Sequence, residues 1–137
     1  MWSETINYPA VFVAAIASFL LGWLWHGPLF GKQWMAMMGI TPERIKTMKM
    51  KPTTAMALGF VSLVVMACVL AHFVAAWGAV GVAGAFSLAF WVWLGFVAMV
   101  HLGSVLWEGR SVKLYLFNVA YQFAVLFLMS LILVLWQ

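Results

Sequence analysis

Four long apolar runs, separated by short polar breaks, dominate this 137-residue chain. They span residues 8–26, 53–76, 82–107 and 114–136. Each run is close to the roughly 20 residues that a helix needs to cross a bilayer. Alternating segments of about 10 residues, which mark the strands of a membrane β-barrel, do not occur. The pattern predicts an all-α fold, a four-span transmembrane helix bundle forming a single membrane domain over residues 1–137.

The break between the first two runs, residues 28–52, has its own pattern. Pro28 disfavours the helical region for Gly27 and is predicted to end the first span there. Residues 29–39 mix large apolar side chains with polar ones, which predicts a short amphipathic helix lying along the membrane surface. Thr41-Pro42 is typical of a helix start and predicts a second short helix.

The distribution of basic residues predicts how the spans are oriented in the membrane. All seven Lys and Arg residues fall in the loops 28–52 and 108–113, against three acidic residues in the chain. The positive-inside rule predicts an inner-membrane protein with both loops cytoplasmic and both termini outside. Tryptophans near the span ends fit this orientation: Trp2, Trp77 and Trp136 at the outer interface, and Trp25, Trp34 and Trp107 at the inner one.

Composition excludes several classes of protein. Hydrophobic residues make up 67% of the chain and charged residues 7%, whereas a soluble domain carries about 25% charged residues. Because most basic residues sit in one loop between apolar runs, they indicate contact with membrane lipids rather than nucleic acid. Cys68 is the only cysteine, so no disulfide can form within one chain.

Two features of the spans concern helix packing. Ala14, Ser18 and Gly22 recur every four residues and form a small-residue face that lets another helix approach closely. This face favours a homo-oligomer or a subunit of a membrane complex. Trp91 and Trp93 lie near the middle of the third span on nearly opposite faces, so at least one is expected to pack inside the bundle.

Polar residues inside spans are costly unless they are paired or hydrated, and they point to candidate sites. Two groups share one helical face each: His101, Ser104 and Glu108 on the third span, and Asn118, Tyr121 and Gln122 on the fourth. With a rise of about 1.5 Å per residue, the two faces reach similar depths and could meet as a polar seam. His26, at the inner end of the first span, could close the same cluster.

The seam has three interpretations. It could be interhelical hydrogen bonding alone, a ligand pocket or proton path, or a catalytic site, although no residue is identified as catalytic. Nearby, Lys32, Arg110 and Lys113 could bind a lipid head group or form a salt bridge with Glu108.

Metal and cofactor sites are not expected. His72 lies near the outer end of its span and His101 in the inner half of the next, so one haem could not use both. Helical His-x-x-x-His and Glu-x-x-His pairs are absent from the sequence.

Two motifs in the chain resemble a known family. They are Gly22-x-x-Trp25-x-Gly27-Pro28-Leu29-Phe30-Gly31-Lys32-x-Trp34, and Trp107-Glu108-Gly109-Arg110 followed by Asn118-x-x-Tyr121. The chain resembles the bacterial integral-membrane family catalogued as domain of unknown function 1761, in which an aromatic residue stands at the position of His26. The resemblance implies a small four-span membrane protein and no particular activity.

The sequence therefore favours a membrane subunit that binds a lipid or a protein partner. A small transporter or channel using the polar seam is the alternative, and an enzyme acting on a membrane-embedded substrate is the third.

Overall fold

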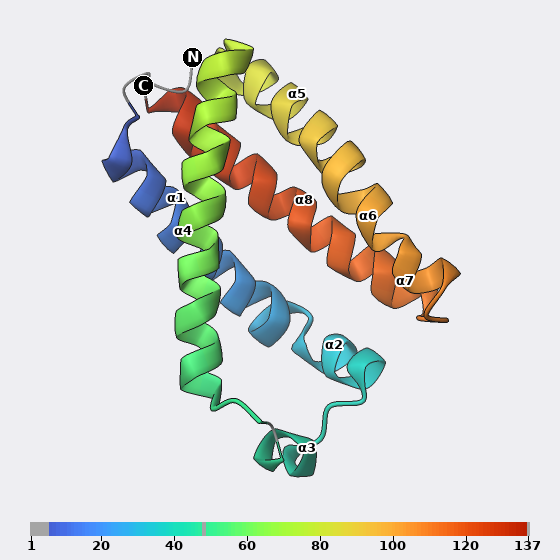
Figure 1. Ribbon diagram of the computed structural model, residues 1–137. Coiled ribbons are helices and arrows are strands. Elements are labelled where there is room, and N and C mark those ends of the chain that lie inside the picture. The colour runs from blue at the N-terminus through green and yellow to red at the C-terminus, as the bar shows by residue number, and fades with distance from the viewer. Residues whose placement is uncertain (1–5, 48, 137) are drawn as a thin grey trace.

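The computed structural model describes residues 6–47 and 49–136, and this part of the chain forms helices joined by short turns, with no strand. Four helical stretches are long and apolar enough to cross a membrane: Tyr8–Leu29, Pro52–Trp77, Gly81–Leu106 and Val112–Leu135. The all-α, four-span prediction is confirmed (Figure 1). The elements are α1 (Tyr8–Leu24), η1 (Trp25–Leu29), α2 (Gly31–Met38), α3 (Pro42–Lys46), α4 (Pro52–Trp77), α5 (Gly81–Trp93), η2 (Leu94–Ala98), α6 (Met99–His101), α7 (Gly103–Leu106) and α8 (Val112–Leu135).

Local sequence explains where the helices begin and end. The Asn7 side chain caps α1 by accepting from the Ala10 amide at 3.1 Å, and the Ser111 hydroxyl caps α8 by accepting from the Lys113 amide at 3.1 Å. Thr41 accepts from the Arg44 amide at 3.3 Å, so the predicted start of the second connector helix is confirmed in α3. Such caps satisfy amides that have no partner within the helix.

The first span does not stop at Gly27-Pro28 as predicted. It continues through η1, a π-helical turn that contains Pro28. Proline lacks an amide hydrogen and its ring crowds the carbonyl four residues earlier, which normally breaks an α-helix. The wider turn avoids this conflict, because the Phe30 amide donates to the Trp25 carbonyl, five residues earlier, at 3.1 Å. The span therefore ends at Leu29.

The third span, predicted over residues 82–107, runs over Gly81–Leu106. It is irregular within these bounds, because it passes through the π-helical turn η2 and has a turn at Leu102 between α6 and α7. A side chain from α8 also forms a hydrogen bond with the backbone of this span: the Tyr115 hydroxyl donates to the Ala98 carbonyl at 2.6 Å. The Leu102 amide uses the same carbonyl at 3.1 Å.

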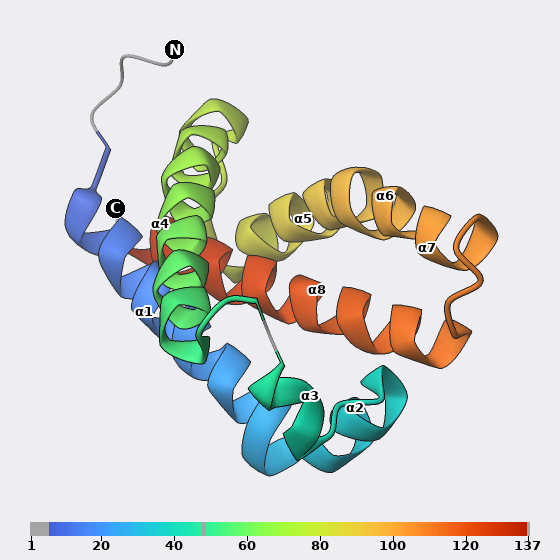
Figure 2. The same ribbon diagram turned by 60° about the horizontal axis from the view of Figure 1, so that its bottom comes forward.

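The helix α8 is the centre of the bundle. It contacts α1, α4 and α5, while α5 to α7 pack on α8 and hardly on the others. Figures 1 and 2 show α8 lying between the α5–α7 arm on one side and α1 with α2 on the other. The second half of α4 is buried at Ala67, Leu70 and Val74, whereas its first half is mostly exposed. That first half stands away from α8 in Figure 1.

The small-residue face of the first span is used within the chain. Ala14 and Ser18 are fully buried, and α1 packs on α4 and α8. The predicted close approach of helices is therefore confirmed, but the neighbours are the chain's own helices. This face consequently gives no support to a homo-oligomer.

Of the two tryptophans in the middle of the third span, one faces inward. The Trp93 indole donates to the backbone carbonyl of Val119 on α8 at 2.7 Å. Trp91 is 55% exposed. The expectation that at least one packs inside the bundle is confirmed. Trp2 lies outside the described residues.

We predict that Trp93→Phe lowers the stability of the folded protein by about 1 kcal/mol, because it deletes an indole that ties α5 to α8. Reversible unfolding in mixed micelles measures this change. Trp91→Phe is the matched control and should leave stability unchanged. Equal effects of the two substitutions would show that the Val119 hydrogen bond contributes nothing.

Candidate functional site

A hollow of about 380 Å³ opens between α1, α4 and α8. Gly22 and His26 line it from the first span, Gly59 and Met66 from α4, and Tyr121 with Gln122 from α8. It exists because the first half of α4 diverges from α8. We call it the α4-side hollow.

A second hollow, also about 380 Å³, lies on the other side of the same residues. We call it the α6-side hollow. His26, Trp34 and Met38 line it from η1 and α2, His101 from α6, and Asn118, Val119, Tyr121 and Gln122 from α8. His26, Tyr121 and Gln122 line both hollows, which therefore adjoin at these three side chains.

The structure thus brings together part of the predicted seam. His101, Asn118, Tyr121, Gln122 and His26 all line the α6-side hollow. Ser104 does not line it, and its hydroxyl donates to the His101 carbonyl at 2.8 Å.

The charged candidates lie apart from both hollows. Glu108 and Arg110 are exposed in the loop before α8, as are Lys113 at the start of α8 and Lys32 on α2. Of the ion pairs predicted for Glu108, none forms between these described residues.

The two imidazoles have the same arrangement. Nδ1 of His26 lies 3.0 Å from the Gly22 carbonyl oxygen, and Nδ1 of His101 lies 2.9 Å from the Val97 carbonyl oxygen. A carbonyl oxygen can only accept, so each Nδ1 carries the hydrogen. In the neutral ring, each Nε2 is then left with a lone pair and acts as an acceptor.

Several polar groups around the hollows have no protein partner. Within residues 6–47 and 49–136, no hydrogen bond reaches Nε2 of either imidazole, the side-chain amides of Asn118 and Gln122, or the Tyr121 hydroxyl. The helices are instead joined across α8 by Trp93 to Val119 and by Tyr115 to Ala98. Sequence reasoning missed Tyr115, although it precedes Asn118 and Gln122 on the same face, at i, i+3 and i+7.

Close packing of α1 on α8 places the Tyr121 ring. A Cβ atom on Gly22 would lie 2.6 Å from the Tyr121 hydroxyl oxygen, so the end of the Tyr121 side chain would have to shift. Glycine at this position allows the hydroxyl to rest against α1 where it does. Gly22 thus serves one particular contact with Tyr121, in addition to the general approach of helices that its spacing predicted.

Aromatic rings hold His26 in place. Its ring centroid lies 4.7 Å from that of Tyr121 and 4.8 Å from that of Trp34, both edge-on. Trp25 packs against Phe30 at 4.9 Å and against Phe117 at 5.8 Å. The prediction of Trp25 as an interfacial anchor is therefore incomplete, since its ring belongs to this aromatic cluster. Phe117 was missed, although it lies four residues before Tyr121 on one face of α8.

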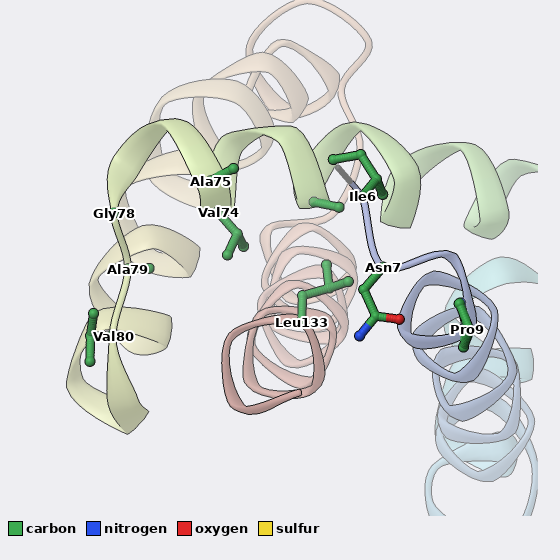
Figure 3. A pocket seen from close by; sticks show the side chains of 10 residues that line it. Ile6, Asn7, Pro9, Val74, Ala75, Gly78, Ala79, Val80 and Leu133 are labelled. Atoms are coloured by element: carbon green, nitrogen blue, oxygen red, sulfur yellow. The ribbon is translucent and has the colours of Figure 1, made fainter. Parts of the chain in front are cut away.

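Two further hollows are chemically poorer. One of about 750 Å³ lies at the end of the bundle where α4 meets α5, and Asn7 is the only polar residue among its described lining (Figure 3). Both polar atoms of the Asn7 side chain are already engaged, since Nδ2 donates to the Trp136 carbonyl at 2.7 Å and Oδ1 caps α1. The other, about 550 Å³, lies beneath the connector, and its polar lining residues are Arg44 and Thr47. Both already donate to backbone carbonyls of the connector.

Among the described residues, no three His, Cys, Asp or Glu side chains lie close enough together to bind a metal ion. What the paired hollows offer is hydrogen bonding inside an apolar and aromatic wall.

Comparison with known proteins gives one match. The sequence model of a family described as "Protein of unknown function (DUF1761)" matches residues 9–134. Searches of curated proteins and of solved structures found no match.

We predict that Gly22→Ala displaces the Tyr121 ring and destabilises the protein by about 1 kcal/mol, the low end for overpacking, because only the end of the Tyr121 side chain has to shift. Thermal unfolding in detergent measures the effect. In the double variant Gly22→Ala/Tyr121→Phe the hydroxyl is gone, so much of the lost stability should return. A double variant no more stable than Gly22→Ala would contradict this explanation.

Proposed function

The chain belongs to the DUF1761 family, and we propose that this small membrane protein binds a lipid-sized amphiphile in the paired hollows. The description of the family names no activity, so the proposal is based on the site. The polar end of the ligand lies at His26, Tyr121 and Gln122. The proposal rests on three polar groups there that have no protein partner among the described residues: Nε2 of His26, the Tyr121 hydroxyl and the Gln122 side-chain amide. Each such group is costly inside a membrane unless a ligand or water satisfies it.

The walls of the α4-side hollow suit an apolar chain. Phe19, Leu63 and Met66 line it together with the polar residues. The diverging half of α4 exposes Met56, Leu58 and Val61, so the hollow adjoins the surface that would face lipid. Volumes of this size lie within the range of about 300–1,000 Å³ typical of small-molecule sites.

A channel is less well supported. The paired hollows and the hollow at the opposite end are separated by a tightly packed layer. Val11, Val125 and Met129 in that layer are at most 1% exposed. A transporter using the same polar residues would have to open this layer, whereas ligand binding needs no such rearrangement.

For orientation, we propose that the end with α2, α3 and the α7–α8 loop is cytoplasmic. All seven basic residues belong to that end, which lies opposite the α4–α5 turn in Figure 1. The positive-inside rule supports this orientation in an inner membrane.

We predict that Gly59→Phe abolishes binding of the amphiphile. A Cβ at Gly59 meets no atom within 4 Å, so a larger side chain can fill the α4-side hollow without strain. Gly95→Phe is the matched control, because a Cβ there also meets no atom within 4 Å and Gly95 lines neither hollow. Native mass spectrometry of the protein released from native-lipid nanodiscs measures the bound mass. Retention of the same bound mass by Gly59→Phe would contradict the proposal.

Cysteine labelling tests the orientation. In a Cys68→Ser background, Val80→Cys should react with a membrane-impermeant maleimide on intact cells, because Val80 is 81% exposed in the α4–α5 turn. Lys46→Cys on α3 should react only after the cells are opened. The reverse pattern would place the connector outside.

A further inference from the structure

We propose that the head group bound in the α6-side hollow is a hydroquinone, a benzene ring with two para hydroxyl groups, and that the reduced form binds in preference to the oxidised quinone. This inference rests on the proposed function and names the chemical class of its ligand. It concerns binding alone.

The two imidazoles favour a ligand that carries hydroxyl donors. His26 and His101 line the same hollow, and they come from elements on opposite sides of α8 (Figure 2). With Nδ1 of each ring donating to a helix carbonyl, each Nε2 offers only a lone pair in the neutral ring. A ligand with a hydroxyl donor at each end satisfies both.

Anionic head groups match this wall poorly. No Lys or Arg is among the described residues that line either hollow. A phosphate or carboxylate would place its negative oxygens against the two Nε2 lone pairs with no cation to compensate. The seven basic residues lie in the loops, where phospholipid head groups would meet them.

Shape and surroundings favour a flat aromatic ring. Trp34 and Tyr121 line the α6-side hollow, and aromatic rings pack well in offset or edge-to-face contacts. An apolar tail on the ring would pass His26 and Gln122, which line both hollows, into the α4-side hollow between Phe19, Leu63 and Met66.

The preference for the reduced form follows from the same atoms. A quinone carries two carbonyl oxygens, which are acceptors and cannot bond to an Nε2 lone pair. Tyr121, Asn118 and Gln122 can donate as well as accept, so they serve both forms. The imidazoles alone distinguish between them.

The test measures binding of radiolabelled 2-decyl-1,4-hydroquinone and 2-decyl-1,4-benzoquinone to the full-length protein in phosphatidylcholine nanodiscs without oxygen. The hydroquinone should bind about a hundredfold more tightly, the equivalent of two hydrogen bonds of about tenfold each. His26→Phe and His101→Phe should each weaken hydroquinone binding about tenfold and change quinone binding less than twofold. His101 is exposed, so its variant keeps the test valid if His26→Phe unfolds.

The matched control is His72→Phe. His72 also places Nδ1 near the carbonyl four residues earlier, at 2.8 Å from Cys68 O, but it lines neither hollow. Hydroquinone binding should not change in this variant. Equal affinity for both forms, or a preference that is undiminished in both His26→Phe and His101→Phe, would overturn the inference.

Failure of this inference is distinguishable from failure of the proposed function. If the unaltered protein retains bound lipid and Gly59→Phe loses it, but the protein does not prefer the hydroquinone to the quinone, only the head-group class is wrong. If no lipid and neither probe is retained, the binding function itself is wrong.

Discussion

The contact between Gly22 and Tyr121 sets the geometry of the connector end of this bundle. Because a hydrogen replaces a side chain at Gly22, the Tyr121 hydroxyl rests against α1 where any Cβ would collide with it. The ring of Tyr121 then packs edge-on against His26. His26 in turn packs against Trp34 of α2, so one close approach of two helices positions the connector and both hollows.

Backbone carbonyls are the second determinant. In the membrane every polar group needs a partner, and this protein repeatedly uses helix carbonyls as acceptors for side chains. Trp93 and Tyr115 reach across to carbonyls of a neighbouring helix, whereas His26 and His101 use carbonyls of their own helices. The cross-helix bonds hold the third span on α8. The intrahelical ones determine that Nε2 is the nitrogen of each imidazole left free to accept.

Much of the architecture could be predicted from hydrophobic run lengths, because crossing a bilayer requires about 20 apolar residues. Depth along the spans also predicted which polar residues gather, and His101, Asn118, Tyr121 and Gln122 do line one hollow. The π-helical turns at Pro28 and Leu94–Ala98 could not be predicted. Pro28 signals a disturbance of the first span but not that a π-helical turn accommodates it, and Leu94–Ala98 contains no proline. The divergence of α4, which creates the α4-side hollow, likewise has no sequence signal.

The central claim is that the polar groups at the paired hollows are satisfied by a bound molecule rather than by one another. A density map of the protein in native-lipid nanodiscs tests this most directly. We expect continuous density for a bound molecule, from between His26 and His101, past Gln122, to the space between α1 and α4. A map in which α4 closes against α8, with His26 and Gln122 hydrogen-bonded to other side chains and no density between them, would contradict it.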